Sequence, residues 1–202
     1  MRRERGNLKS AFGARDLFDW IYAVLHSSTY RSRYADFLKS DFPRVPLPKD
    51  RCLFAELITA GTELVGLHLL DAHNAPILAD PKVRYVSQGG DPRLGLWGDT
   101  KEVRRDACGR VYLNSTAWFE TVPEGAWNHR IGSYQPAQKW LKDRAAKDGK
   151  KKSDGRVLTP EDQLHYRRMI VALERTAEIM IEIDQVIEKH GGWPDAFRGM
   201  TD

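Results

Sequence analysis

Residues 131–144 combine cationic, aromatic and amide side chains within one short segment. A Gly-Ser turn comes first, and Pro136 then occupies the first position of a predicted short helix. Cations bind phosphate groups and planar rings stack on bases, so the segment is a candidate nucleic-acid contact. The alternative is an ordinary capped helix that buries Trp140 and Leu141 and leaves its charges in solvent. On the first interpretation, Trp140 and Leu141 also anchor the helix in the core, and the side chains that face the nucleic acid are Tyr134, Gln135, Lys139 and Arg144.

Positive charge is concentrated from Lys139 to Arg156, where eight basic residues outnumber three acidic ones. This local net charge of +5 exceeds the +4 of the whole chain, so the other residues sum to about −1. A concentrated patch attracts a polyanion more strongly than the same charge spread out. The predicted basic loop at 145–156 is also typical of a solvated, disordered segment, and both descriptions hold if it orders on binding. The predicted phosphate contacts are Lys139, Lys142, Arg144, Lys147, Lys150, Lys151 and Lys152.

A β-hairpin is predicted over residues 101–114, with its turn at 106–109. Its apolar residues Val103, Val111 and Leu113 are expected to face the core, which leaves arginines on the rim. Arginine pairs well with guanine, and asparagine or glutamine pairs well with adenine. The candidates for reading bases are therefore Arg104, Arg105, Arg110, Asn114, Tyr134 and Gln135.

Catalytic and metal-binding motifs are missing from the sequence. It contains no phosphate-binding P-loop, no dinucleotide-binding glycine motif, no Gly-x-Ser-x-Gly elbow and no His-Glu-x-x-His pair. We therefore predict no catalytic residue and no metal site, although a site assembled from residues distant in sequence would leave no motif. A cryptic nuclease is a third possibility that no residue pattern supports.

The composition is typical of a soluble globular chain, with 202 residues of which 41% are hydrophobic and 30% charged. No apolar run approaches the roughly 18 residues of a transmembrane helix, and no apolar segment follows the charged start at Met1–Arg5. The two cysteines, Cys52 and Cys108, form no paired motif, which suits a reducing compartment. We expect a cytoplasmic protein with no membrane partner.

The predicted fold class is α+β, with N-terminal helices, a small and mostly antiparallel β region in the middle, and a long C-terminal helix. Residues 1–15 are expected to form an arm or to mark a truncation. The segment 16–75 is predicted to contain a helix from Asp16, a second helix capped by Thr29, an extended proline-rich connector over 41–48 and a helix from Asp50 to about residue 73.

The segment 76–202 is predicted to be a second domain. A strand is expected around residues 82–86, followed by the hairpin. Thr159-Pro160-Glu161-Asp162 is a strong helix start, and apolar residues then recur every three or four positions up to the glycines at 191–192. The predicted long helix therefore spans residues 160–190.

Several blocks of the chain resemble known proteins. Phe18–Ser27, Tyr30–Lys39 and residues 41–46 resemble the end of the adenine-N6 methyltransferase part of single-chain restriction-modification enzymes. Residues 131–144 and Asp162–Tyr166 look like the C-terminal specificity domain of type ISP restriction enzymes, and the blocks keep their order over about residues 16–193. Two positions depart from the expected pattern, namely Ser133 in place of a glycine and Ser28 in place of a proline.

The resemblance implies that residues 76–202 form a target-recognition domain, which reads duplex DNA beside methyltransferase and translocase parts. It also implies that the helical segment 16–75 joins this domain to a methyltransferase-like part. The cofactor-binding glycine motif and the Asn/Asp-Pro-Pro-Tyr/Phe motif of the methyltransferase are absent from these residues. The expected partners are duplex DNA and the methyltransferase part of the same system. S-adenosylmethionine, ATP and Mg²⁺ would belong to other parts of the parent enzyme.

The sequence therefore favours one of two functions. The first is sequence-specific recognition of duplex DNA as the specificity part of a restriction-modification system, without catalysis in this chain. The second is a protein–protein docking or structural module of a larger DNA-modifying assembly, suggested by the apolar stripe of the long predicted helix.

Overall fold

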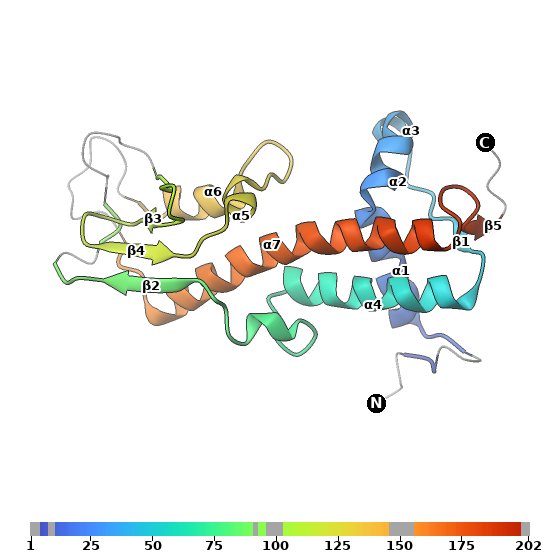
Figure 1. Cartoon of the computed structure of the whole chain (residues 1–202), viewed down its shortest axis with the longest axis horizontal. Helices are drawn as coiled ribbons and strands as arrows, with labels where there is room; N and C mark the ends of the chain where they lie inside the picture. Colours follow the sequence, from blue (N-terminus) through green and yellow to red (C-terminus); the bar gives the residue numbers. More distant parts are fainter. Residues whose placement is uncertain (1–4, 8–10, 91–92, 96–102, 146–155, 199–202) are drawn as a thin grey trace. The chain divides into compact units, whose positions relative to one another are not determined.

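The computed structural model of the chain describes residues 5–7, 11–90, 93–95, 103–145 and 156–198 (Figure 1). These residues fall into two compact units, one made of Met1–Ala75 with Arg175–Asp202 and the other of Pro76–Glu174. The division lies inside the long helix α7, which runs from Pro160 to Lys189. The predicted α+β class and the predicted long helix are both confirmed.

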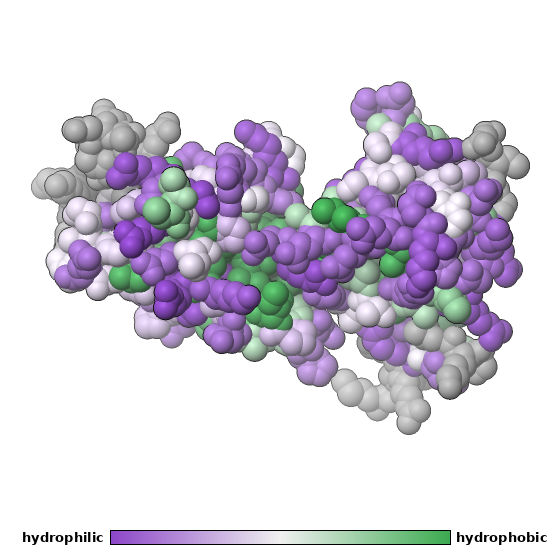
Figure 2. All heavy atoms as spheres, in the orientation of Figure 1, coloured by the Kyte–Doolittle hydropathy of each residue, from purple (hydrophilic) through white to green (hydrophobic). Residues whose placement is uncertain are grey.

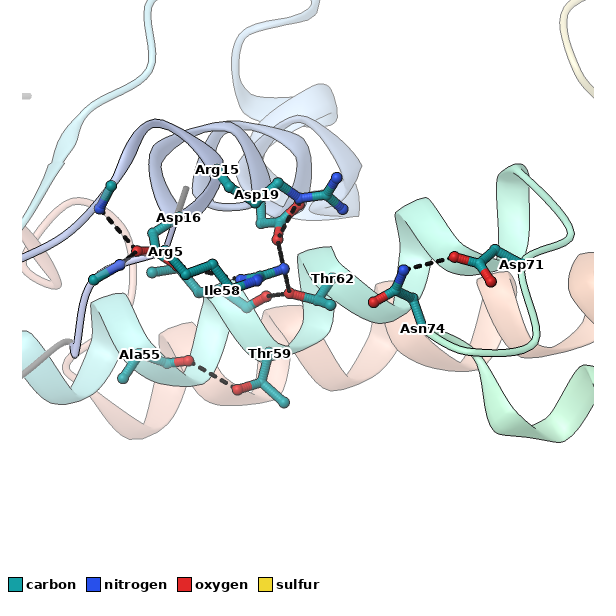
Figure 3. Close-up of polar contacts among 12 residues, drawn as sticks. Arg5, Arg15, Asp16, Asp19, Ala55, Ile58, Thr59, Thr62, Asp71 and Asn74 are labelled. Carbon is teal, nitrogen blue, oxygen red and sulfur yellow. Dashed lines mark hydrogen bonds and ion pairs between the residues drawn. The ribbon is translucent and has the colours of Figure 1, made fainter. Parts of the chain in front are cut away.

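Helix α1 begins in the first unit at Ala14 and ends at His26, so it starts before the predicted Asp16. Asp16 is nevertheless the residue that closes its N-terminus, because its Oδ2 accepts hydrogen bonds from the N–H groups of Gly13 (2.9 Å) and Gly6 (2.6 Å). The guanidinium of Arg5 contacts Asp16 at 3.2 Å and Asp19 at 2.6 Å (Figure 3). Part of the stretch expected to be an arm is thus held against α1.

Helix α4, Arg51–His68, packs against α1. Asp50 is its N-cap, with a side chain that accepts a hydrogen bond from Leu53 N–H at 2.9 Å. The helix ends at His68 rather than near residue 73, because Leu70 takes a positive φ of 53° and Asp71 N–H turns back to the carbonyl of Gly66. The prediction of this C-terminal end was therefore wrong.

The single helix predicted after residue 27 is two helices, α2 (Ser28–Arg33) and α3 (Ala35–Ser40). Ser27, rather than the predicted Thr29, caps α2 by accepting a hydrogen bond from Tyr30 N–H at 3.0 Å. The buried Ser27 hydroxyl also donates to Asp184 of α7 at 2.5 Å. This contact, between residues distant in sequence, explains why a local pattern did not identify the cap.

The proline-rich connector ends in a short strand, β1 (Leu47–Pro48). It pairs antiparallel with β5 (Phe197–Arg198), near the C-terminus. The C-terminal half of α7 completes this unit, with Ile179, Ile183 and Ile187 fully buried. Within the described residues, no helix is both long enough and apolar enough to cross a membrane.

The second unit contains a three-stranded antiparallel sheet in the order β2-β4-β3. Its strands are β2 (Arg84–Ser87), β3 (Val111–Tyr112) and β4 (Ala117–Glu120), preceded by the 3-10 helix η1 (Pro76–Leu78). Two short helices follow, α5 (Glu124–Asn128) and α6 (Pro136–Lys142). The central strand β4 was not predicted.

The predicted hairpin is present in reduced form. Its turn is confirmed, because Asp106 N–H bonds to the carbonyl of Arg110 at 2.9 Å and Gly109 takes a φ of 81°. A bridge joins Arg105 to Val111, but the regular pairing of β3 is with β4 and not with the residues before the turn. Residues 101–102 lie outside the described part of the chain. The predicted inward positions Val103, Val111 and Leu113 are confirmed as buried.

The N-terminal half of α7 covers one face of this sheet. Tyr166 is fully buried, and its ring centre lies 4.5 Å from that of Phe119 in β4. Arg167 donates to the carbonyls of Val83 and Pro81, and Arg168 donates to that of Leu78. These arginines hold α7 against the segment that leads into β2.

Candidate nucleic-acid interface

The turn before α6 places Tyr134 and Gln135 at the start of that helix. Ile131 and Tyr134 exchange backbone hydrogen bonds at 3.0 and 3.3 Å, and Gly132 takes the left-handed conformation with a φ of 59°. The left-handed position thus falls on Gly132, so Ser133 does not need the freedom of a glycine there. Tyr134 is 46% exposed, and Gln135 is the half-buried N-cap residue of α6.

Trp140 lies at the centre of a stack of planar groups on α6 and α7. Its ring centre is 5.8 Å from that of His165 with nearly parallel planes, and the guanidinium carbon of Arg144 lies 3.7 Å from the same ring centre. Leu141 is fully buried, as the sequence predicted, whereas Trp140 is half-buried. Helix α6 is therefore anchored through Leu141 and presents one side of Trp140 to Arg144.

Arg144 follows the C-cap residue of α6, and its side chain folds back onto that helix. Its Nη1 donates to the carbonyl of Trp140 at 3.1 Å, and its Nε is buried without a hydrogen-bond partner. Burial and then the Arg144 charge lower the pKa of His165, while Asp162 acts in the opposite direction. Because the pKa of His165 is lowered, its ring is neutral near pH 7. Arg144 is then the cation that lies beside Trp140.

The other lysines predicted to bind phosphate differ in their surroundings. Lys139 forms an ion pair at 2.8 Å with Asp143, the C-cap residue of α6. Lys142 is exposed near the end of the same helix. Lys147, Lys150, Lys151 and Lys152 lie outside the described residues.

Two of the predicted base-reading arginines, Arg104 and Arg110, are exposed beside strand β3. The guanidinium of Arg104 lies 5.0 Å from the ring centre of Tyr112, and that of Arg110 lies 5.3 Å from the ring centre of Trp118. These cation–π contacts fix the directions of two cations that would otherwise sample many rotamers. Hydrophilic residues cover most of the face that Figure 2 shows for each unit.

Arg105 and Asn114 instead organise the backbone. Arg105 is half-buried and donates from Nε to the carbonyl of Val122 at 2.7 Å. Asn114 donates to the carbonyl of Arg93 at 3.0 Å and accepts from Thr116 N–H at 2.8 Å. The structure therefore places Arg104 and Arg110 over the neighbouring rings of Tyr112 and Trp118, whereas Arg105 and Asn114 are bound to loops. Tyr134, Gln135, Lys139 and Arg144 lie along or next to α6, and Lys139 and Arg144 each contact another residue of that segment.

Asp106 holds the turn that precedes β3. Burial acts to raise its pKa, but hydrogen bonds from Arg110 N–H and the Tyr112 hydroxyl outweigh burial, and the pKa lies below its ordinary value. The ionised Asp106 therefore positions the backbone of Arg110.

Arg84 and Glu120 are not among the DNA-binding residues predicted from the sequence, although both lie close to Arg110 or to its partner. They face each other across β2 and β4, and Glu120 also lies 3.6 Å from Nε of Arg110. Arg84 lies in the alternating pattern of residues 82–86, but Glu120 could not be placed beside it while β4 was unrecognised. Within the described residues, no group of three or more potential metal ligands is found.

The comparisons with known proteins agree with one another. The family model of the type ISP C-terminal specificity domain matches residues 2–182. A nuclease-deletion mutant of the Type ISP restriction-modification enzyme LlaGI, in complex with a DNA substrate mimic, has a TM-score of 0.57 at 23% identity. The ATP-dependent Type ISP enzyme LlaBIII bound to DNA has a TM-score of 0.57 at 18% identity, and a DrdV–DNA complex has 0.51 at 22%.

These alignments cover 85%, 87% and 89% of this chain but 14%, 11% and 18% of the three larger chains. The chain thus spans a small part of the length of each of these proteins. No curated protein matches it.

Proposed function

Because the chain belongs to the type ISP C-terminal specificity domain family, we propose that it recognises a target sequence in duplex DNA as the specificity part of a restriction-modification system. The match of the family model over residues 2–182 carries this proposal. In the proposed role the chain has no catalysis of its own. S-adenosylmethionine, ATP and Mg²⁺ are then ligands of other parts of the parent enzyme.

The chemistry of the second unit supports duplex binding. Arg104 and Arg110 are exposed and held over aromatic rings, and Tyr134 is exposed at the start of a helix that carries Lys139 and Lys142. The three proteins with similar folds are described as bound to DNA or to a DNA mimic. In our proposal, lysines set the register on phosphates, and exposed arginine side chains together with Gln135 discriminate bases.

The affinity of the purified chain for a labelled 30-base-pair duplex over a salt series tests this function. We expect the logarithm of the binding constant to fall linearly with the logarithm of the salt concentration. Replacing Lys150, Lys151 and Lys152 by alanine is expected to weaken binding and to reduce the slope by about one for each phosphate group that the variant no longer neutralises.

A matched variant removes three exposed cations from the first unit, as Lys39→Ala, Arg44→Ala and Lys49→Ala. It makes the same change in net charge, and its affinity for the duplex is expected to stay closer to that of the unmodified chain. Binding without salt dependence, or an unchanged affinity after loss of Lys150–Lys152, would contradict the proposal.

We also propose that the first unit docks on the methyltransferase part of the same system. The supporting observation is an apolar hollow of about 360 Å³ in this unit, lined by Phe12, Leu17, Leu47 and Phe54 among others. Phe12 and Leu47 are 62% and 66% exposed, which is unusual for large apolar side chains that lie together. The resemblance of residues 18–46 to the end of a methyltransferase part points to the same partner.

A further inference from the structure

The three-stranded sheet has one face turned away from α7. Successive side chains of a strand point to opposite faces, and Phe119 packs against Tyr166 of α7. Trp118 and Glu120 therefore share the other face of β4. The strand register places Tyr112 beside Trp118, and Arg84 beside Glu120.

Glu120 is the centre of the polar contacts on this outer face. Trp118 Nε1 donates to Glu120 Oε1 at 3.1 Å. Arg84 Nη2 lies 3.5 Å from Oε2, and Arg110 Nε lies 3.6 Å from Oε1. One carboxylate therefore joins residues from β2 and β4 and the residue just before β3.

Glu120 is less exposed to solvent than the two arginines that it contacts. The Glu120 side chain is 22% exposed, whereas those of Arg84 and Arg110 are 71% and 45% exposed. A guanidinium has five N–H donors in a fixed fork, so a carboxylate that holds one edge leaves donors on the other edge for a ligand. The ring of Trp118 lies below Arg110 and limits its rotation further.

Stability alone is a weak reason for this arrangement. Ion pairs between exposed side chains contribute little to stability, and both distances here exceed that of a short charge-assisted bond. A carboxylate on a face that binds DNA also repels phosphates and thus lowers affinity for any duplex. Its presence between two exposed arginines therefore favours a role in selecting what the arginines bind.

We propose that Glu120 is a positioning residue for specificity, which orients Arg84 and Arg110 toward guanine edges and disfavours their use on phosphates alone. This inference rests on the proposed function and adds Arg84 to the residues that contact the duplex. Arginine contacts the O6 and N7 atoms of guanine through two parallel hydrogen bonds, and a fixed guanidinium orientation is what such a contact requires.

The experiment uses the full 202-residue chain and a pool of duplexes with a randomised segment. The duplex enriched by the unmodified chain and a shuffled duplex of the same composition are then compared by equilibrium binding. Glu120→Gln is expected to lower the ratio of the two affinities by about tenfold or more, while affinity for the shuffled duplex stays equal or rises. In the pool enriched by the variant, preference is expected to weaken at a G·C pair.

Glu124→Gln is the matched control, because Glu124 is an exposed glutamate in the first turn of α5 in the same unit. It makes the same charge change and is expected to keep the affinity ratio. A purely structural role for Glu120 predicts instead a lower melting temperature with both affinities reduced in parallel, and that result would overturn the inference.

The two proposals can fail separately. If the unmodified chain binds duplex with salt dependence but enriches no sequence, or if Glu120→Gln keeps the full ratio, the role of Glu120 is refuted and duplex binding stands. If the unmodified chain shows no salt-dependent duplex binding, the proposed function itself fails.

Discussion

Gly61 determines how closely two helices approach in the first unit. A Cβ atom added there would overlap the carbonyl oxygen of Asp19, so the backbones of α1 and α4 can meet only if residue 61 lacks a side chain. The close approach also brings Thr62 within 2.8 Å of the buried Asp19 carboxylate, which Arg5 and Arg15 also contact (Figure 3). One missing methyl group thus permits a buried ionic cluster.

Gly61→Ala is expected to destabilise the chain by about 1–3 kcal/mol, because the helices must separate or the backbone must shift. This sign is opposite to the usual gain of about 0.5–1 kcal/mol for alanine over glycine inside a helix. Gly125 in α5 has open space around its Cβ position and supplies the control, since Gly125→Ala is expected to be neutral or stabilising. Urea unfolding followed by circular dichroism measures both. Equal effects of the two substitutions would contradict this account.

At the scale of an element, α1 depends on a carboxylate that is nearly fully buried. Asp16 is 1% exposed, and burial acts to raise its pKa. Hydrogen bonds from the N–H groups of Gly13 and Gly6, together with Arg5, outweigh burial, so its pKa in the folded chain lies below the ordinary 3.8. Stability from this group is therefore present above pH 3.8 and is lost as the pH falls through the folded pKa.

Asp16→Asn is expected to lower the free energy of unfolding by about 1 kcal/mol at neutral pH, since the cap loses its charge and Arg5 loses a partner. The difference in the free energy of unfolding between the variant and the unmodified chain should become smaller as the pH falls below 3.8. Asp36→Asn, an exposed residue in the first turn of α3, serves as the control and should change stability by less than about 0.5 kcal/mol. Thermal melts at several pH values provide the measurement. A difference that persists unchanged at low pH would refute the role of the Asp16 charge.

At the scale of the whole molecule, each proposed interaction belongs to one unit. The sheet and α6 lie in the second unit, whereas the apolar hollow lies in the first. Helix α7 contributes to both, with Tyr166 beneath the sheet and Ile183 in the helical core. Changes to the hollow and changes to the sheet should therefore affect different partners.

The double variant Phe12→Ser and Leu47→Ser is expected to weaken binding to the methyltransferase polypeptide by about tenfold or more, because two exposed apolar side chains leave the interface. Affinity for duplex DNA should not change. Ile181→Ser is the control, since Ile181 is a 60% exposed apolar residue outside the hollow in the same unit. Co-elution and calorimetry with the purified partner measure the effect. Undiminished binding by the double variant would exclude the hollow as the docking surface.

Local sequence was sufficient for the features that local physics controls. The cap, proline and acids at residues 159–162 start α7, and its regular apolar spacing continues to Lys189. The turn at 106–109 and the inward positions Val103, Val111 and Leu113 also follow from neighbouring residues. The family resemblance rested on short blocks in order, and it agrees with the family match.

Features that depend on contacts between residues distant in sequence could not be predicted from local sequence. Ser27 is a cap partly because Asp184 binds its hydroxyl, and β1 exists because β5 pairs with it. In the candidate site, local sequence does not distinguish Arg104, Arg105 and Arg110, which are arginines of the same predicted hairpin. In the structure, Arg105 binds the carbonyl of Val122, while Arg104 and Arg110 are exposed. Glu120 acquires its neighbours only when β4 pairs with both β2 and β3. Residue types therefore indicated the chemistry, while strand pairing and burial determined which side chains are available to perform it.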